Sequence, residues 1–173
     1  MKIAIIGANG SDTMEWNLWE AFSFADHQCK IFDIYDLSQF YRNKFVGHYV
    51  KTIDKLARTY SDSYDTKIFS KLANRVNDYN PDLVVCVYRF IHPCFVEMVQ
   101  KSGRKVIHIN PDALTTFEFQ QLFASKYDAW FTKDPYIVHF MRDNMKLNVY
   151  YYDEAFNLRY HKKPICTKEE CEK

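Results

Sequence analysis

Short apolar runs alternate with helix-like patterns from one end of the chain to the other. The run Lys2–Gly7 is continuously apolar after its first residue, as expected for a strand buried on both faces. Five more strands are predicted at residues 29–37, 83–88, 105–109, within 127–135, and at 148–156. Six strands joined by crossovers predict an α/β fold, in which a Rossmann-like, doubly wound parallel sheet forms a single domain.

Helix signals occupy the segments between these strands. Ser11 or Asp12 is predicted to cap the first helix, and Glu15 would complete a capping box. Apolar residues then recur at helical spacing over residues 49–79, where the stretch 61–63 is expected to separate two helices. Three further helices are predicted: one from Pro93 to a cap at Gly103, one over residues 117–125, and one over residues 136–145 that Pro135 opens.

Composition narrows the class of protein without identifying a function. The 173 residues are 47% hydrophobic and 26% charged, which suits one globular domain with a substantial core. A net charge of +1 gives no long-range attraction toward nucleic acid, and no apolar run reaches membrane-spanning length. Five cysteines without metal-ligand spacing, together with the lack of a signal peptide, predict a cytoplasmic protein without a metal site.

Two glycines after the first strand raise the question of a nucleotide site. A dinucleotide-binding turn has a third glycine where its helix packs on the strand, and this chain has the β-branched Thr13 there. This weighs against NAD(P), although Asp33 or Asp36 could imitate the acid that binds a ribose. The loop could still present N–H groups from a helix N-terminus to an anion or a hydroxyl group.

Polar residues follow the predicted strands at their carboxyl ends, where open parallel sheets bind ligands. These candidates are Gly10, Ser11, Arg89, His92, Asn110, Asp112, Lys133, Asp134 and Glu154. His92 is the better candidate for proton transfer, because a neutral imidazole titrates near physiological pH. His108 lies inside an apolar strand and is predicted to be a hydrogen-bonded structural residue. Each candidate taken alone could instead be a cap or turn residue, and Lys133 with Asp134 could form an ion pair or a helix cap.

The second half of the chain carries two longer motifs, "YDAWFTKDPYIVHFMRD" at residues 127–143 and "NVYYYDEAFNLRYH" at residues 148–161. They resemble the amino-terminal half of CgeB-type, or spore-maturation-type, glycosyltransferases, which have the two-domain GT-B fold. In the first half of the chain, the resemblance extends only to the architecture.

The resemblance implies an acceptor-binding domain, spanning residues 1–160, of an enzyme that transfers sugar from a nucleotide sugar without a metal or another cofactor. Residues 161–173 would be a charged tail or a linker toward a missing carboxyl-terminal donor-binding domain, and the isolated chain is expected to be inactive. His92 or Asp112 would be the catalytic base. The expected substrate-binding residues are Gly10, Ser11, Arg89, Asn110, Lys133, Asp134 and Glu154. A non-catalytic Rossmann-like module that binds a nucleotide or a protein is the alternative.

Overall fold

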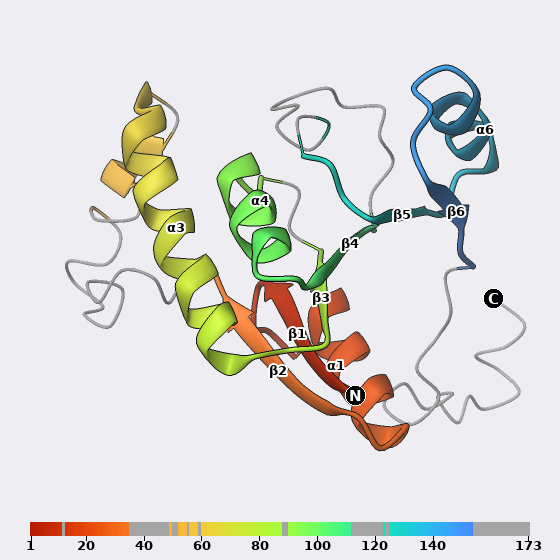
Figure 1. Cartoon of the computed structure of the whole chain (residues 1–173), viewed down its shortest axis with the longest axis horizontal. Helices are drawn as coiled ribbons and strands as arrows, with labels where there is room; N and C mark the ends of the chain where they lie inside the picture. Colours follow the sequence, from red (N-terminus) through yellow and green to blue (C-terminus); the bar gives the residue numbers. More distant parts are fainter. Residues whose placement is uncertain are drawn as a thin grey trace, which may run out of the picture.

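A computed structural model describes residues 1–11, 13–34, 49, 52–54, 56–58, 60–87, 90–111, 123 and 125–153 of the chain. Within these residues, six strands form one sheet in the order β2-β1-β3-β4-β5-β6, and all neighbouring pairs are parallel (Figure 1). The strands are β1 (Lys2–Gly7), β2 (Gln28–Asp33), β3 (Leu83–Cys86), β4 (Lys105–Asn110), β5 (Ala129–Thr132) and β6 (Val149–Tyr151). The predicted Rossmann-like α/β sheet is confirmed.

The strand order changes direction at β1, which has β2 on one side and β3 on the other. Ile6, next to the end of β1, is in register with Cys86 at the end of β3. The loops that leave these two strands therefore begin side by side at the carboxyl edge of the sheet, meaning the edge formed by the carboxyl ends of the strands. Such a switch point is the place where open α/β sheets bind ligands.

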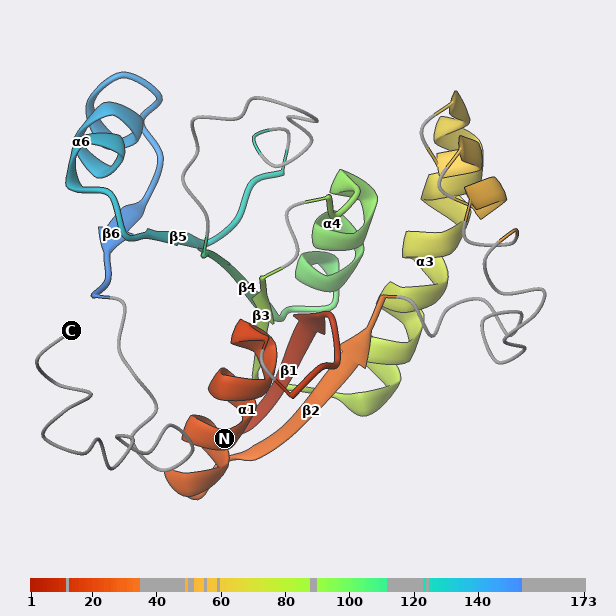
Figure 2. The same ribbon diagram turned by 180° about the vertical axis from the view of Figure 1, so that it is seen from behind.

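Helices cover both faces of the sheet. One face of β1 contributes Ile3 and Ile5 to a core shared with α1 (Met14–Phe24), and the other contributes Ala4 and Ile6 to a larger core. The larger core lies beneath α3 (Asp62–Tyr79), α4 (Pro93–Lys101) and α6 (Pro135–Asp143). Figure 2, seen from behind, shows α1 in front of β1 and β2, with α3 and α4 on the far side.

The helix boundaries confirm some sequence predictions and correct others. Ser61 accepts a hydrogen bond from the Tyr64 N–H and caps α3, so the predicted division of residues 49–79 is confirmed. Gly103 follows Ser102, the cap of α4, with a φ of +82°, and its N–H donates to the Gln100 carbonyl, as predicted for a helix end. The cap of α1 is Thr13, not Ser11, while the alternative at residue 12 lies outside the described residues.

Several strands are shorter than predicted within the described part of the chain. β2 ends at Asp33 rather than at residue 37, although residues 35–37 lie outside the described residues. β3 ends at Cys86, and β6 comprises Val149–Tyr151 only. The expected helix over residues 117–125 and the expected domain boundary at residue 160 also fall mostly or wholly outside the described residues. None of the helices in the described ranges is long and apolar enough to cross a membrane.

Candidate functional site

The loop between β1 and α1 is closed by a carboxylate from its own helix. Glu15 is buried, and its Oε1 accepts a hydrogen bond of 2.8 Å from the Ala8 N–H. A Cβ atom at residue 7 would collide with this carboxylate, so Glu15 can occupy this position only because residue 7 is a glycine. The Thr13 hydroxyl donates to the Gly10 carbonyl (2.9 Å) and accepts from the Trp16 N–H (3.3 Å).

This arrangement explains why the loop differs from a dinucleotide-binding turn. In such a turn, backbone N–H groups at the start of the helix bind a phosphate. Here the Glu15 carboxylate already accepts from the Ala8 N–H, and its negative charge would repel a phosphate brought to the same place. Thr13 occupies the position of the third glycine because the residue there is the helix cap. At this loop, Asn9 and Ser11 are exposed to solvent and Gly10 is partly exposed.

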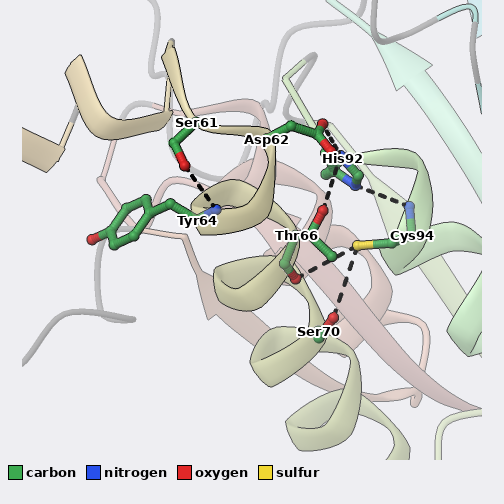
Figure 3. Close-up of polar contacts among 7 residues, drawn as sticks. All are labelled: Ser61, Asp62, Tyr64, Thr66, Ser70, His92 and Cys94. Carbon is green, nitrogen blue, oxygen red and sulfur yellow. Dashed lines mark hydrogen bonds and ion pairs between the residues drawn. The ribbon is translucent and has the colours of Figure 1, made fainter.

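His92 lies at the carboxyl edge after β3 and caps α4. Its Nδ1 accepts a hydrogen bond of 3.2 Å from the Cys94 N–H, while its Nε2 lies 3.0 Å from Asp62 Oδ1 and 3.4 Å from Thr66 Oγ1 (Figure 3). The side chain is mostly buried, and its ring stacks on Phe69 with centroids 6.4 Å apart. His92 therefore joins the first turn of α4 to α3.

These contacts define the tautomer of the neutral ring. Because Nδ1 accepts from a backbone N–H, the neutral imidazole must carry its proton on Nε2 and donate it to Asp62. The lone pair that would accept a proton from a substrate is thus already used by the helix cap. His92 can act as a base only after it gives up the Cys94 N–H, and its catalytic role remains a prediction.

Two further titratable side chains lie beside His92. Asp65 is only 4% exposed, and burial raises the pKa of its carboxyl, an effect that Arg58 and His92 partly oppose. Its Oδ1 has no hydrogen-bond partner. The Cys94 thiol donates to the Thr66 carbonyl across 3.7 Å, and burial raises its pKa, which disfavours the nucleophilic thiolate. This cluster consequently resembles a structural junction more than an activated nucleophile.

The ends of β4 and β5 contribute the remaining described candidates. Asn110 is buried and in register with Thr132, and its carbonyl accepts a 3.0 Å hydrogen bond from the Tyr152 hydroxyl. The same hydroxyl lies 3.9 Å from the sulfur of Met14, so it links the end of β4 to the first turn of α1. Asp134 caps α6 by accepting from the N–H groups of Tyr136 and Ile137, which confirms the cap interpretation of this residue.

The candidates from the sequence thus divide into two groups along the carboxyl edge. Gly10 and Ser11 lie in the loop that leads into α1, and Tyr152 links Met14, the first residue of that helix, to Asn110. His92 lies with α3 and α4, on the opposite face of the sheet from α1. Lys133 is partly exposed directly after β5. Arg89, Asp112 and Glu154 lie outside the described residues.

His108 corrects one expectation about a structural histidine. It is fully buried in β4, as predicted, but neither ring nitrogen has a hydrogen-bond partner. Its ring packs instead against Tyr127 and Trp130, with centroids 5.2 and 5.1 Å away. Burial lowers its pKa to about 3, so the imidazole is neutral at physiological pH. The apolar pattern of β4 predicted its burial but contains no information on its partners.

Sequence reasoning missed Asp62, Thr66 and Tyr152 as contributors to this edge. Asp62 follows the Ser61 cap, so its place in the first turn of α3 was readable, but its contact with His92 is tertiary. Tyr152 lies in the second of the two longer motifs. Only its residue type and its place in the sixth predicted strand could have pointed to it.

No protein-family model matches the chain, and no curated protein sequence matches it either. Among solved structures, it is similar to a LacI family transcriptional regulator from Silicibacter pomeroyi, at 8% identity over 66% of this chain and 34% of that one, with a TM-score of 0.33. It is also similar to an ABC transporter solute binding protein from Clostridium phytofermentans with bound beta-D-glucose, at 12% identity over 83% of this chain and 37% of that one, with a TM-score of 0.39. The chain thus spans about a third of the length of each of these proteins.

Proposed function

We propose that this chain is the acceptor-binding half of a two-domain, metal-independent GT-B glycosyltransferase. In this proposal it holds a sugar or glycoconjugate at the carboxyl edge of its sheet, while a donor-binding domain supplies the nucleotide sugar. Two features support it: the six-stranded parallel sheet, and the motifs at residues 127–143 and 148–161 that resemble the amino-terminal half of that family.

The observation that carries the proposal is the Glu15 carboxylate, which reaches from α1 into the loop after β1. A donor-binding domain must stabilise a diphosphate with N–H groups and cations. This loop instead directs a carboxylate to the Ala8 N–H and leaves the neutral side chains of Asn9 and Ser11 exposed. Neutral hydrogen-bonding groups beside a fixed negative charge favour a ligand with hydroxyl groups over one with phosphates. An acceptor sugar has that chemistry.

Ligand-induced thermal stabilisation tests the proposal directly. The chain would be melted with a panel of neutral oligosaccharides, with UDP-, GDP- and dTDP-sugars, and with NAD(P). We expect at least one neutral oligosaccharide to raise the Tm, because a ligand that binds only the folded state stabilises it by mass action. Stabilisation by NAD(P) alone would contradict the proposal.

A pair of serine variants locates the binding surface. Ser11→Trp places a large side chain on the exposed loop after β1 and should abolish the stabilisation by that oligosaccharide. Ser102→Trp is the matched control, because Ser102 is also exposed but precedes β4 at the opposite edge of the sheet. Equal loss of stabilisation in both variants would place the site elsewhere.

A second candidate function is a binding module without catalysis. The cap geometry of His92 favours it, since both ring nitrogens are engaged in holding α3 and α4 together. His92→Asn separates the two functions, because asparagine retains a cap acceptor and removes the imidazole. In the complete transferase, loss of turnover with unchanged stability would support a catalytic His92, whereas unchanged turnover would assign it the structural role alone.

A further inference from the structure

A row of large apolar side chains is exposed on a helical segment that precedes α3. Residues 49, 52–54, 56–58 and 60 are helical and are called the 49–60 segment below. Tyr49, Ile53, Leu56 and Tyr60 form its apolar stripe, with exposures of 73%, 65%, 51% and 83%. Figures 1 and 2 both place the segment beside the first turns of α3, away from the strands. Large apolar residues gathered on one exposed helix face mark an interaction surface.

Polar contacts hold the segment in this orientation. Asp54, on the side opposite the stripe, is only 6% exposed and accepts a 2.8 Å hydrogen bond from the Tyr64 hydroxyl of α3. Arg58 Nε lies 3.0 Å from Asp54 Oδ2, and its guanidinium group lies over the Phe69 ring at 5.8 Å. The segment therefore packs on α3 through its charged face. Its apolar face is turned outward by these specific contacts.

The spacing of the stripe is that of a helix-pairing seam. Its intervals of four, three and four residues follow the a and d positions of two heptads, with Ile53 at a and Leu56 at d. The stripe also reads alike in both directions, since an aromatic residue stands at each end and an aliphatic pair in the middle. The flanking positions that the structure describes are Thr52 at g and Ala57 at e, and neither residue is charged.

We propose that the apolar stripe is a homodimer interface, in which two copies of this chain pair their 49–60 segments antiparallel about a two-fold axis. This pairing sets Ile53 against Leu56 of the partner subunit, and Tyr49 against Tyr60 of the partner subunit. An interface of this kind uses the same surface on both copies and must be self-complementary. The symmetric order of the stripe meets this requirement, and its described flanking residues, Thr52 and Ala57, bring no like charges together. The inference is independent of the proposed function.

Sedimentation velocity over a range of protein concentrations tests the interface. We expect the wild-type chain to form dimers at rising concentration. Ile53→Lys and Leu56→Glu should each raise the dimer dissociation constant by about tenfold or more, because each change places a charge in an apolar seam. Both positions are more than half exposed, so neither change disturbs the core. Tyr136→Lys on α6 is the matched control, since Tyr136 is 73% exposed and lies outside the stripe.

Mixing the two charged variants distinguishes the antiparallel pairing from any other. In a mixed dimer, Lys at position 53 of one copy faces Glu at position 56 of the other, and the second contact remains a leucine against an isoleucine. We therefore expect the equimolar mixture to form dimers when each variant alone is monomeric. A wild-type chain that is monomeric at every concentration overturns the proposal, and so does a dimer that survives both single changes. A mixture that stays monomeric overturns the antiparallel arrangement.

Discussion

Two helical segments carry apolar residues at similar helical spacing, but one row of apolar side chains is buried and the other is exposed. Ile68, Leu72 and Val76 of α3 are 6%, 0% and 0% exposed and lie in the larger core. Ile53 and Leu56 of the 49–60 segment belong to an equally regular stripe but are 65% and 51% exposed. The comparison shows that apolar periodicity identifies one face of a helix and does not identify what that face contacts.

The two rows differ in exposure because each helix packs on the rest of the molecule through a different face. α3 packs its apolar face into the larger core, shared with α4 and the sheet. The 49–60 segment lies beyond that layer and meets α3 through Asp54 and Arg58. A buried charged face needs partners in fixed positions, and Tyr64 and Phe69 provide them on α3. The polar contacts thus decide which way the apolar stripe of the segment points.

The largest expected effect comes from truncating one leucine in each stripe. Leu72→Ala removes a fully buried side chain and should lower the free energy of unfolding by about 2–5 kcal/mol. Leu56→Ala removes the same atoms from an exposed position and should change it by about 0.5 kcal/mol or less under conditions where the chain is monomeric. Urea denaturation at low protein concentration measures both. Equal losses would mean that the 49–60 stripe is buried within the monomer.

Removing the charged contact beneath the segment should have an intermediate effect. Asp54→Ala deprives the Tyr64 hydroxyl of its acceptor and Arg58 of its ion pair, and we expect a loss of about 1–3 kcal/mol in the free energy of unfolding. Hydrogen exchange should show the accompanying loss of protection in the 49–60 segment. Tyr64→Phe is the graded control, because it removes one hydrogen bond and retains the ion pair. A variant as stable and as protected as the wild type would show that these contacts do not hold the segment.

The sheet was the most predictable part of the fold because its signals are local. The apolar run of β1 and the proline at the start of α4 indicate their elements without reference to the rest of the chain. The cap of α1 was not predictable to the residue. Ser11, Asp12 and Thr13 are all good cap residues, and local sequence does not decide which hydroxyl or carboxylate reaches the helix.

The candidate site was less predictable because its main contacts join elements that are distant in sequence. Glu15 was expected to bond within its own helix start, yet its carboxylate reaches the Ala8 N–H where β1 and α1 lie together. The proximity of His92 to Asp62 depends on α3 and α4 packing side by side, which no motif encodes. The exposure of the apolar stripe likewise depends on how the 49–60 segment packs on α3, which the sequence pattern does not show.

A smaller expected change in stability comes from Asp65, a buried acid of α3 close to Asp54 and Arg58 of the 49–60 segment. Burial raises its folded pKa above the ordinary value of 3.8, so folding favours the protonated form. The stability that this carboxyl contributes is therefore fully present below pH 3.8 and is lost as the pH rises through its folded pKa. Asparagine has a similar shape and cannot ionise. Asp65→Asn should accordingly raise the free energy of unfolding at pH 7 by about 1 kcal/mol.

The pH dependence of this gain shows whether it comes from the raised pKa of the buried carboxyl or from the removal of a charge in general. The advantage of Asp65→Asn over the wild type should shrink as the pH falls from 7 toward 4, because the wild-type carboxyl then becomes protonated in the folded state. Asp26→Asn is the control: Asp26 is exposed, and its φ of +58° is one that asparagine also tolerates, so we expect little change at any pH. A gain at Asp65 that is constant from pH 4 to pH 7 would show that the acid is ionised throughout and paired with Arg58 or His92. The buried layer between the two stripes would then be held by a network of charges, and the outward orientation of the 49–60 segment would depend on Asp65 as well as on Asp54.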